Sequence, residues 1–346
     1  MKILFIGNNF ATQIFSKKFA EYKQVEIFST INIEGINFVD INYLDFDNLL
    51  EFVKNNKIEL VIISDYRALE SDFSEKLKQE GIGVFAPDCG INRITNDRAK
   101  AKKFLYRNKI ETTPFVICDK PQNAYEYIKK ANYPLCIKPN EHCETLGTVI
   151  CETYKEANAA LAKFYENDSS TIVFENFIEG REFTAYIITD GINAKLLNFV
   201  TTKNSRWAKS GINFGDEEFK KKVIEEFINP LMIALSNEGE YIGIIGIDFL
   251  LDNENNLYVL ECNPFFQSLD VEIFTSSCRE NLIELFESAL SGDLVEKYKE
   301  VKFDDMVYVA EIDNQGKINT YQGRTLHEAL EISESKELQK EFEWKF

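Results

Sequence analysis

Hydrophobic and polar positions at the start of the chain follow two alternating patterns. The short apolar runs KILFIG, ELVIISD and GVFAP are typical of buried β-strands. The stretches TQIFSKKFAEY and SDFSEKLKQEG between them have the spacing of amphipathic helices. Strands that alternate with helices form a mostly parallel sheet with helices on its faces. The sequence therefore predicts an N-terminal α/β domain.

The middle of the chain continues with longer elements. A helix is predicted from Asp97 to Arg107, followed by the strand IETTPFVIC, the helix AYEYIKKAN, the strand YPLCIKPN and the amphipathic helix KEANAALAKFYEN. STIVFENFI and REFTAYIITDG are predicted to be two strands separated by the turn Glu179-Gly180. YIGIIGIDFLLD and NENNLYVLECNPF are predicted to form a hairpin across the turn at 253–256. From about residue 297, MVYVAEI and KINTYQG indicate two short strands before a closing helix.

Composition and charge narrow the classes of function. The chain has 346 residues, of which 45% are hydrophobic, and a formal net charge of −18. A surface this negative repels phosphate backbones and anionic lipid, so neither nucleic acid nor a membrane is expected as the main partner. The apolar run in MKILFIGNN is too short for a signal peptide, and no run approaches about 18 apolar residues, so a soluble, cytoplasmic protein is expected.

Cysteine and histidine offer little material for catalysis. The seven cysteines form no C-x-x-C pair and are expected to be reduced thiols, mostly buried. With only His142 and His327, a zinc site or a Ser-His-Asp triad is not favoured. Chemistry is therefore expected to depend on carboxylates, lysine, arginine and backbone groups.

The turn Gly7-Asn8-Asn9-Phe10 lies where a dinucleotide-binding fold has its glycine fingerprint. It has the first glycine of that fingerprint and lacks the second and third. A plain strand-to-helix turn is therefore preferred over an NAD site.

Asp248, Glu261 and Asn263 are the strongest local signal for chemistry. Positions 261 and 263 lie on the same face of a strand, and the predicted hairpin folds Asp248 back beside them. Two carboxylates and an amide oxygen suit Mg²⁺, whose remaining ligands substrate phosphates would supply. The alternative is an ion pair of Asp248 or Glu261 with a nearby lysine.

Two further segments indicate nucleotide binding. Lys138 follows the apolar run PLCI at a strand's end, where it would either deliver charge to phosphate or be an ordinary edge-strand lysine. In FENFIEGREFT, the backbone of Glu175–Ile178 lies at a hinge where it could pair with an adenine edge, and Glu182 could accept from ribose hydroxyls. Acidic residues that are merely solvated are the alternative.

In chain order these segments resemble the ATP-grasp superfamily. That superfamily has, in order, a basic residue on a helix, a strand lysine, a short loop, the hinge E-x-F-[LI]-x-G-x-E and then D-x(12)-E-x-N. In the same order, this sequence supplies Arg98, Lys138, the loop around Gly147, the hinge Glu175–Glu182 and the set Asp248, Glu261 and Asn263. The series spans roughly residues 90–290. Within the superfamily, KILFIGNN, YPLCIKP and TIVFENFIEGREFTAYIITDG are most similar to glycinamide ribonucleotide synthetase.

The resemblance implies an architecture. The expected fold is α/β: a pre-ATP-grasp, Rossmann-like parallel-sheet domain at 1–93 and an ATP-grasp domain at 94–296 with a small lid at roughly 112–180. A small C-terminal α+β appendage is expected at 297–346.

The resemblance also implies an activity: an ATP-dependent ligase that joins a small-molecule carboxylate to an amine through an acyl-phosphate. ATP phosphates would bind Arg98 and Lys138 under a loop with Thr145, Gly147 and Thr148. Adenine would bind Glu175, Asn176, Phe177 and Ile178, and ribose would bind Glu182. Mg²⁺, or alternatively Mn²⁺, would bind Asp248, Glu261 and Asn263. Arg206, in the loop TTKNSRWAKS, is the candidate for stabilising the oxyanion of the reacting carboxylate, with Lys138 as the second catalytic residue. A solvated basic loop is the alternative for Arg206.

The sequence departs from the family pattern at several places. The phosphate loop NEHCETLGTVI has only Gly147, Asn8–Thr12 replace a G-G-R-E-H-like turn, and no arginine follows Asn263. Altered substrates, with an amino-acid-type carboxylate, are therefore expected. A degenerate, non-catalytic ATP-binding regulator or partner protein is the alternative function. A homo-oligomer is compatible with the sequence.

Overall fold

Two compact units make up the chain. The computed structural model describes residues 1–140, 147–167, 169–203, 207–210, 216–266, 268–314 and 317–333, without the side chains of 202, 203, 207–210 and 268. The first unit consists of Met1–Ile91, Phe183–Gly246 and Pro264–Phe346, and the second of Asn92–Glu182 and Ile247–Asn263. The three-part division expected from the resemblance stays a prediction.

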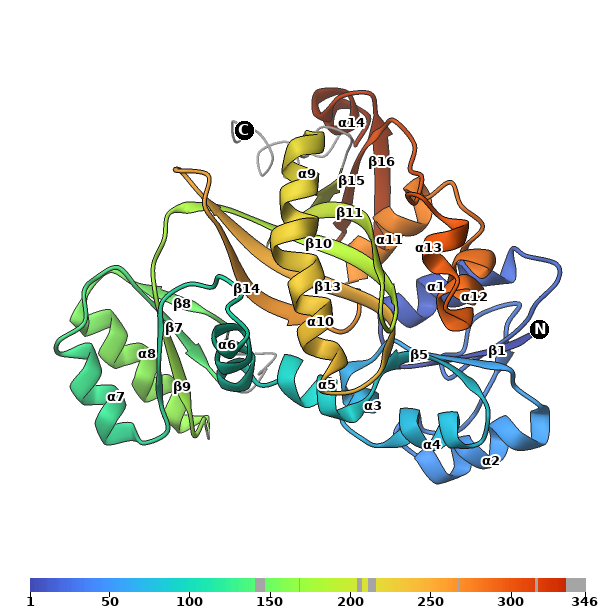
Figure 1. Ribbon diagram of the computed structural model, residues 1–346, viewed down its shortest axis with the longest axis horizontal. Coiled ribbons are helices and arrows are strands. Elements are labelled where there is room, and N and C mark those ends of the chain that lie inside the picture. Colours follow the sequence, from blue (N-terminus) through green and yellow to red (C-terminus); the bar gives the residue numbers. More distant parts are fainter. Residues whose placement is uncertain are drawn as a thin grey trace. The chain divides into compact units, whose positions relative to one another are not determined.

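Strands and helices alternate through the start of the first unit, as the sequence predicts (Figure 1). The strands are β1 (Lys2–Ile6), β2 (Glu26–Ser29), β3 (Asn37–Phe38), β4 (Leu60–Ile63) and β5 (Gly83–Pro87), and the helices are α1 (Phe10–Ala20), α2 (Phe46–Asn56), α3 (Tyr66–Leu69), α4 (Phe73–Gln79) and α5 (Cys89–Thr95). The strands lie in the order β5-β4-β1-β2-β3, and each neighbouring pair is parallel.

Successive residues of β1 enter two different cores because side chains alternate between the faces of a strand. Phe5 packs against Phe19 of α1, with the ring centroids 5.4 Å apart. Leu4 belongs to the other core, together with Leu49 of α2 and Phe73 of α4. Helices therefore cover both faces of the parallel region, which explains why its central strands β1, β4 and β5 are apolar at nearly every position.

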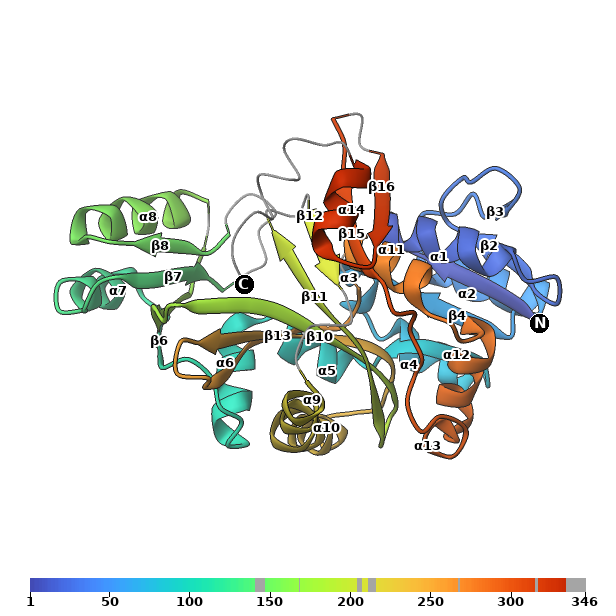
Figure 2. The same ribbon diagram turned by 90° about the horizontal axis from the view of Figure 1, so that it is seen from above.

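An antiparallel region continues this sheet. Its strands are β10 (Gly180–Asp190), β11 (Ala194–Lys203), β12 (Trp207–Ser210), β13 (Tyr241–Asp252), β15 (Val307–Ile312) and β16 (Ile318–Gly323), in the order β16-β15-β12-β11-β10-β13-β5. The accompanying helices are α9 (Glu217–Val223), the π-helix η1 (Ile224–Ile228), α10 (Asn229–Ser236), α11 (Ser268–Ser277), α12 (Leu282–Ser291), α13 (Leu294–Lys297) and α14 (Leu326–Ser333). The predicted C-terminal strands and closing helix are present, and α14 packs on Val309 of β15 through Ala329 and Leu330 (Figure 2).

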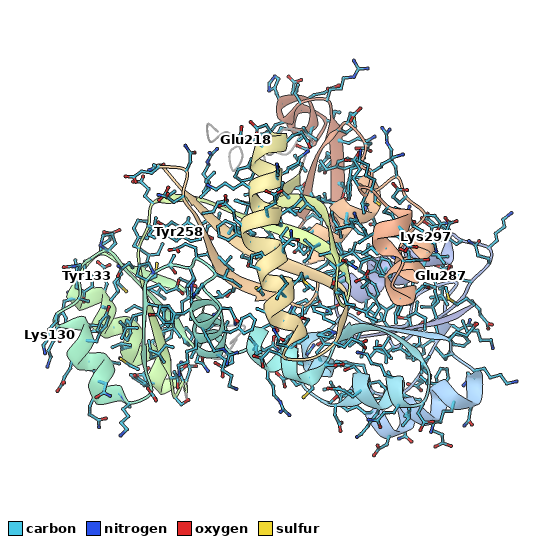
Figure 3. The ribbon with its side chains drawn as sticks, viewed as in Figure 1. Lys130, Tyr133, Glu218, Tyr258, Glu287 and Lys297 are labelled. Atoms are coloured by element: carbon cyan, nitrogen blue, oxygen red, sulfur yellow. The ribbon has the colours of Figure 1, made fainter. Side chains whose placement is uncertain are left out.

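The second unit has an antiparallel sheet of its own. β6 (Phe115–Cys118), β9 (Ile172–Asn176), β7 (Leu135–Pro139) and β8 (Val149–Cys151) lie in that order, and α7 (Pro121–Ile128) and α8 (Tyr154–Glu166) pack on one face. Ile128 and Leu161 of the helices share a core with Ile137 and Phe174 of the strands. Tyr133, labelled in Figure 3, donates a hydrogen bond of 2.7 Å to the carbonyl of Ile128 and so ties the end of α7 to the start of β7.

The predicted hairpin in the second unit is formed by the end of β13 and by β14 (Leu257–Asn263). Asp252 closes its turn, because one carboxylate oxygen accepts from the backbone N–H groups of Glu254 and Asn256 at 2.9 and 2.8 Å. Asn255 adopts a φ of 65°, which asparagine tolerates well. The turn thus lies within the predicted residues 253–256 and sets the register that brings the candidate metal ligands together.

The helix predicted at Asp97–Arg107 is α6 (Arg98–Arg107). Asp97 is its N-cap and accepts a hydrogen bond of 2.8 Å from the backbone of Lys100. This cap places Arg98 at the first helical position. No helix within the described ranges is long and apolar enough to cross a membrane.

Candidate active site

Three buried charged side chains meet at the end of β9. Glu175 is 3% exposed and lies between two lysines: its Oε1 is 2.7 Å from Nζ of Lys138 on β7, and its Oε2 is 2.9 Å from Nζ of Lys102 on α6. Thr113 donates a short hydrogen bond to the same carboxylate. We call Lys102, Glu175 and Lys138 the lysine–glutamate triad; its net charge is positive when all three groups are ionised.

Burial and pairing shift the pKa values of the triad in different directions. Burial would raise the pKa of Glu175, but the attraction of Lys138 and Lys102 outweighs it and lowers that pKa to about 2. Burial lowers the pKa of Lys102 to about 8, although Glu175 opposes this. Burial also acts to lower the pKa of Lys138, yet attraction to Glu175 and Glu261 prevails, so that this pKa is raised. Lys138 therefore keeps its positive charge across the physiological range.

The candidate metal ligands lie together in the same unit. Asn263 on β14 donates a hydrogen bond of 3.0 Å from Nδ2 to Oδ2 of Asp248 on β13. Glu261, two residues before Asn263, has Oε2 3.7 Å from Nε of Arg98, and its side chain is 26% exposed. The sequence left a choice between a metal site and an ion pair with lysine; Glu261 does form an ion pair, with Arg98 in place of a lysine.

Positive and negative charges are separated among the triad, Arg98, Asp248 and Glu261, which together we call the charged cluster. The triad is positive, whereas Asp248 and Glu261 outnumber Arg98 at the hairpin and leave that part negative. A divalent cation carried by a polyphosphate has the complementary arrangement, because the cation seeks carboxylates and the phosphates seek ammonium groups. Within the described ranges no group of three or more His, Cys, Asp and Glu side chains could hold a metal. A metal ion bound at the hairpin would therefore need the amide oxygen of Asn263 and oxygens of a bound nucleotide as further ligands.

The candidate adenine hinge lies between β9 and β10. The backbone N–H of Asn176 already donates to the carbonyl of Pro114 at 3.0 Å, whereas Phe177 and Ile178 lie outside both strands. A Cβ on Gly180 would come within 2.4 Å of the carbonyl oxygen of Leu251, so glycine allows the chain to pass β13 at this point. Glu182 is exposed on β10 just beyond.

Of the four remaining predicted residues, the structure describes two. Gly147 and Thr148 are exposed just before β8. Thr145 and Arg206 lie outside the described residues, so their predicted contacts with phosphate and with the reacting carboxylate stay predictions.

Lys102 is the charged residue that the sequence analysis missed. It occupies an apolar-face position of α6, three residues from buried Ala99 and three from buried Leu105. A lysine at such a position is unusual unless it is paired. That break in the helical pattern was the signal available in the sequence, but its partner on β9 was not.

The turn after β1 in the first unit is closed by its own side chains. Oδ1 of Asn9, the N-cap of α1, accepts from the backbone and hydroxyl of Thr12, and Nδ2 of Asn9 donates to the carbonyl of Ser64 at 2.7 Å. Gly7 has a φ of +155°, and a Cβ there would be 2.3 Å from Oγ1 of Thr12. The geometry supports a plain structural turn, the interpretation preferred over an NAD site.

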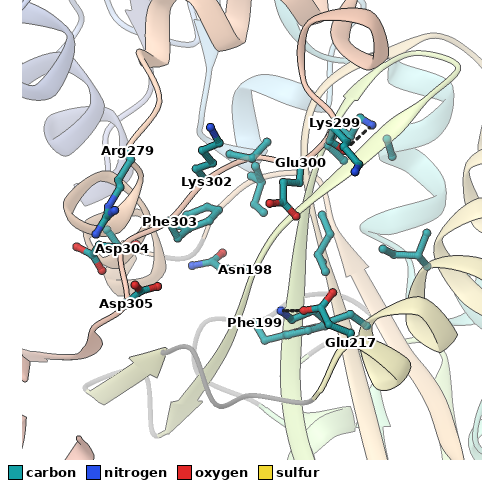
Figure 4. A pocket seen from close by; sticks show the side chains of 18 of the residues that line it. Asn198, Phe199, Glu217, Arg279, Lys299, Glu300, Lys302, Phe303, Asp304 and Asp305 are labelled. Atoms are coloured by element: carbon teal, nitrogen blue, oxygen red, sulfur yellow. Dashed lines mark hydrogen bonds and ion pairs between the residues drawn. The ribbon is translucent and has the colours of Figure 1, made fainter. Parts of the chain in front are cut away.

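A cavity of about 1070 Å³ lies elsewhere in the first unit (Figure 4). β11, α9 and the segment 299–306 line it, and both charge signs are present, as Lys299, Glu300 and Asp304 show. Of the predicted site residues that the structure describes, none lines this cavity.

The fold and this grouping of charged residues define an ATP-grasp protein. A solved structure of phosphoribosylamine–glycine ligase from Thermotoga maritima superposes with a TM-score of 0.75 at 17% identity, covering 95% of this chain and 94% of that one. A solved L-amino acid ligase from Bacillus licheniformis has a TM-score of 0.68 at 18% identity, covering 90% and 79%.

The chain belongs to the phosphoribosylglycinamide synthetase family: the profile of that family's ATP-grasp (A) domain matches residues 96–271, and that of its N domain matches residues 1–94. Phosphoribosylamine–glycine ligase of Escherichia coli K12 is 25% identical over 327 residues, which cover 87% of this chain and 76% of that protein. The enzyme of the same name from Clostridium acetobutylicum is 24% identical over 319 residues, covering 85% and 76%. The predicted fold class and family are confirmed, and the chain is an enzyme of the ATP-grasp ligase class.

Proposed function

We propose that this enzyme joins a carboxylate to an amine at the expense of Mg-ATP, through an acyl-phosphate, and that its substrates differ from those of phosphoribosylamine–glycine ligase. The observation that carries the proposal is the segregated charge of the second unit, with a positive lysine–glutamate triad and a negative hairpin. Membership of the family supplies the class of reaction.

Several groups of the second unit would hold ATP. Lys138 and Arg98 would bind phosphates, and the backbone at Phe177 and Ile178 would pair with adenine. Asp248, Glu261 and Asn263 fit Mg²⁺, or alternatively Mn²⁺, because their donors are two carboxylates and one amide. When bound, the ion would offset negative charge on the phosphates as the γ-phosphoryl group is transferred.

The bond changes follow from this arrangement. A carboxylate oxygen of the first substrate attacks the γ-phosphorus, the bond to the β–γ bridging oxygen breaks, and ADP leaves. The amine of the second substrate then attacks the acyl carbon, an amide forms, and inorganic phosphate leaves after the nitrogen loses a proton. The protein binds and orients these groups, and no side-chain nucleophile is required.

The first unit supports altered substrates. Phosphoribosylamine–glycine ligases have a glycine-rich, charged turn after the first strand, as the resemblance implies, whereas Asn8–Thr12 stand here. The turn is packed shut by Asn9, Thr12, Ser64 and Asp65. We expect an amine other than phosphoribosylamine as the acceptor and an amino-acid-type carboxylate as the other substrate.

Oxygen-isotope transfer tests the proposed function. The enzyme is incubated with Mg-ATP, ¹⁸O-carboxylate-labelled amino acids and a panel of amines that includes other amino acids. Passage of one labelled oxygen into the released phosphate, together with ADP, would support an acyl-phosphate. ADP formation with no label in the phosphate for any productive pair would refute it.

A regulatory ATP-binding protein is the competing function. The single glycine of the phosphate loop, Gly147, is the observation that favours it. Such a protein would be stabilised by nucleotide and would release no ADP with any carboxylate and amine pair.

A further inference from the structure

The two lysines of the triad differ in how many hydrogen-bond partners they have. Nζ of Lys102 has three acceptors, Oγ1 of Thr112 at 2.8 Å, Oγ1 of Thr113 at 2.9 Å and Oε2 of Glu175 at 2.9 Å, which match the three N–H donors of an ammonium group. Among the described residues, Nζ of Lys138 is paired only with Oε1 of Glu175, at 2.7 Å. Lys102 is therefore saturated by the protein, whereas Lys138 keeps donors for a ligand.

We propose that Lys102 is a positioning residue of the nucleotide site: by neutralising Glu175, it leaves the charge of Lys138 available to the phosphates of the nucleotide. This inference rests on the proposed function, because it assigns a role in nucleotide binding to a residue whose three ammonium donors are all taken by protein acceptors.

Charge balance gives the physical reason. Glu175 with Lys138 alone is neutral, so an approaching phosphate would gain little from that pair. A second ammonium group on the far oxygen of Glu175 returns one positive charge to the triad, while Glu175 continues to hold Lys138 in place. The side chains of Lys102 and Glu175 are each 3% exposed, and such burial strengthens every one of these interactions.

The cost of burying Lys102 also favours this role. One lysine suffices to neutralise one carboxylate, and a second buried ammonium group carries a desolvation penalty, which is visible in its lowered pKa of about 8. The competing explanation is purely structural: Lys102 would tie α6 to β9 and to the segment at Thr112 and Thr113. The two explanations predict different behaviour of nucleotide affinity.

Calorimetric titration with Mg-ADP at pH 7 separates them. Lys102→Met removes the charge from the triad, and we expect its dissociation constant to rise about 10-fold or more. Lys103→Met is the matched control, because it makes the same substitution at the next, exposed residue of α6. Its dissociation constant should stay within about 2-fold of the original.

A double variant tests the charge balance directly. Lys102→Met/Glu175→Gln removes one positive and one negative charge and restores a net positive triad through Lys138. We expect it to recover most of the affinity that Lys102→Met loses, although Lys138 is held less firmly. Equal weakening in the single and double variants, with equal loss of thermal midpoint, would show structural anchoring and overturn the proposal.

The pH dependence of Mg-ADP binding gives an independent readout. The charged or titratable groups around Lys102 are Glu175 on β9, Lys138 on β7, and Glu261 and Cys262 on β14. Since Lys102 has a pKa of about 8, affinity in the unmodified enzyme should fall as pH rises from 7 to 9, and this fall should be absent in Lys102→Met. A fall of equal size in the variant would refute the inference.

The outcomes also separate this inference from the proposed function. If the unmodified enzyme bound no Mg-ADP, the proposed function would fail. If the enzyme bound Mg-ADP and Lys102→Met bound it equally well, only the role of Lys102 would fail.

Discussion

The turn after β1 and the charged cluster of the second unit both gather polar side chains at the ends of buried strands. They differ in how these side chains are paired. In the turn, the groups satisfy one another: Asp65, 1% exposed, accepts from the backbone of Asn8 and from the backbone and guanidinium of Arg67. In the cluster, Lys138 keeps donor capacity and opposite charges are drawn apart.

This difference distinguishes polar groups that stabilise the fold from polar groups that are available to bind a ligand. A closed network gains little from a ligand, because binding would first break internal hydrogen bonds. A cluster with segregated charge carries an electrostatic cost that a complementary ligand relieves. Substitutions in the cluster should therefore alter binding and catalysis, and substitutions in the turn should alter stability alone.

Replacing Glu261 by alanine should give the largest effect. We expect turnover to fall about 10²- to 10³-fold or more, because one of two carboxylates for the metal is lost. Its ion pair with Arg98 is partly exposed, so the thermal midpoint should change by only a few degrees. Turnover is measured by ADP release and the midpoint by calorimetry; turnover within about 3-fold of the original would contradict the metal assignment.

Glu175 should govern stability in acid. Its pKa of about 2 lies below the ordinary value of 4.5, so the ionised form stabilises the fold above about pH 4.5, and that contribution is lost as pH falls toward 2. The loss amounts to about 3 kcal/mol. Urea unfolding of the enzyme and of Glu175→Gln between pH 2 and 7 measures it; parallel stability curves for the two proteins would disprove the assignment.

Gly7→Ala tests the structural role of the turn after β1. The added Cβ would collide with Oγ1 of Thr12 at 2.3 Å and approach Cβ of Asp65 at 3.0 Å, in a backbone conformation that alanine rarely adopts. We expect a loss of about 1–3 kcal/mol in the free energy of unfolding. Mg-ADP affinity, measured by calorimetry on the folded protein, should be unchanged; a large loss of affinity would contradict a purely structural role of the turn.

Arg67→Lys should give the smallest effect. The lysine keeps the charge beside Asp65 but loses the two-pronged hydrogen bond and the contact over Tyr43 and Tyr66. Because the Arg67 side chain is 40% exposed, about 1 kcal/mol or less of unfolding free energy should be lost. A loss comparable with that of Gly7→Ala in the same urea experiment would show that the pair is more important than its exposure indicates.

The sequence predicted most of the fold because its strongest signals are local. The apolar spacing of α1 and α8, the helix predicted at Asp97–Arg107 and the turn at 253–256 each depend on a few neighbouring residues, and the structure contains all of them. The proximity of Asp248 to Asn263 followed from that hairpin. These inferences needed no knowledge of distant contacts.

The charged partners could not be predicted in the same way. Lys102 meets Glu175 across 73 positions of sequence, and the local pattern around Glu175 indicates a role only for its backbone at the hinge. Only the packing of α6, β7 and β9 brings the three groups of the triad together. Which buried carboxylate neutralises which lysine is a property of tertiary contact, and helical spacing alone does not contain it.

The division of the chain has a practical consequence for dissecting this enzyme. The second unit is discontinuous: Ile247–Asn263, which carries all three candidate metal ligands, is separated from Asn92–Glu182 by a long segment of the first unit. Cutting the gene at a single point therefore cannot release the nucleotide-handling part intact. Exchange of this part between relatives would have to transplant two segments together, or join them by circular permutation.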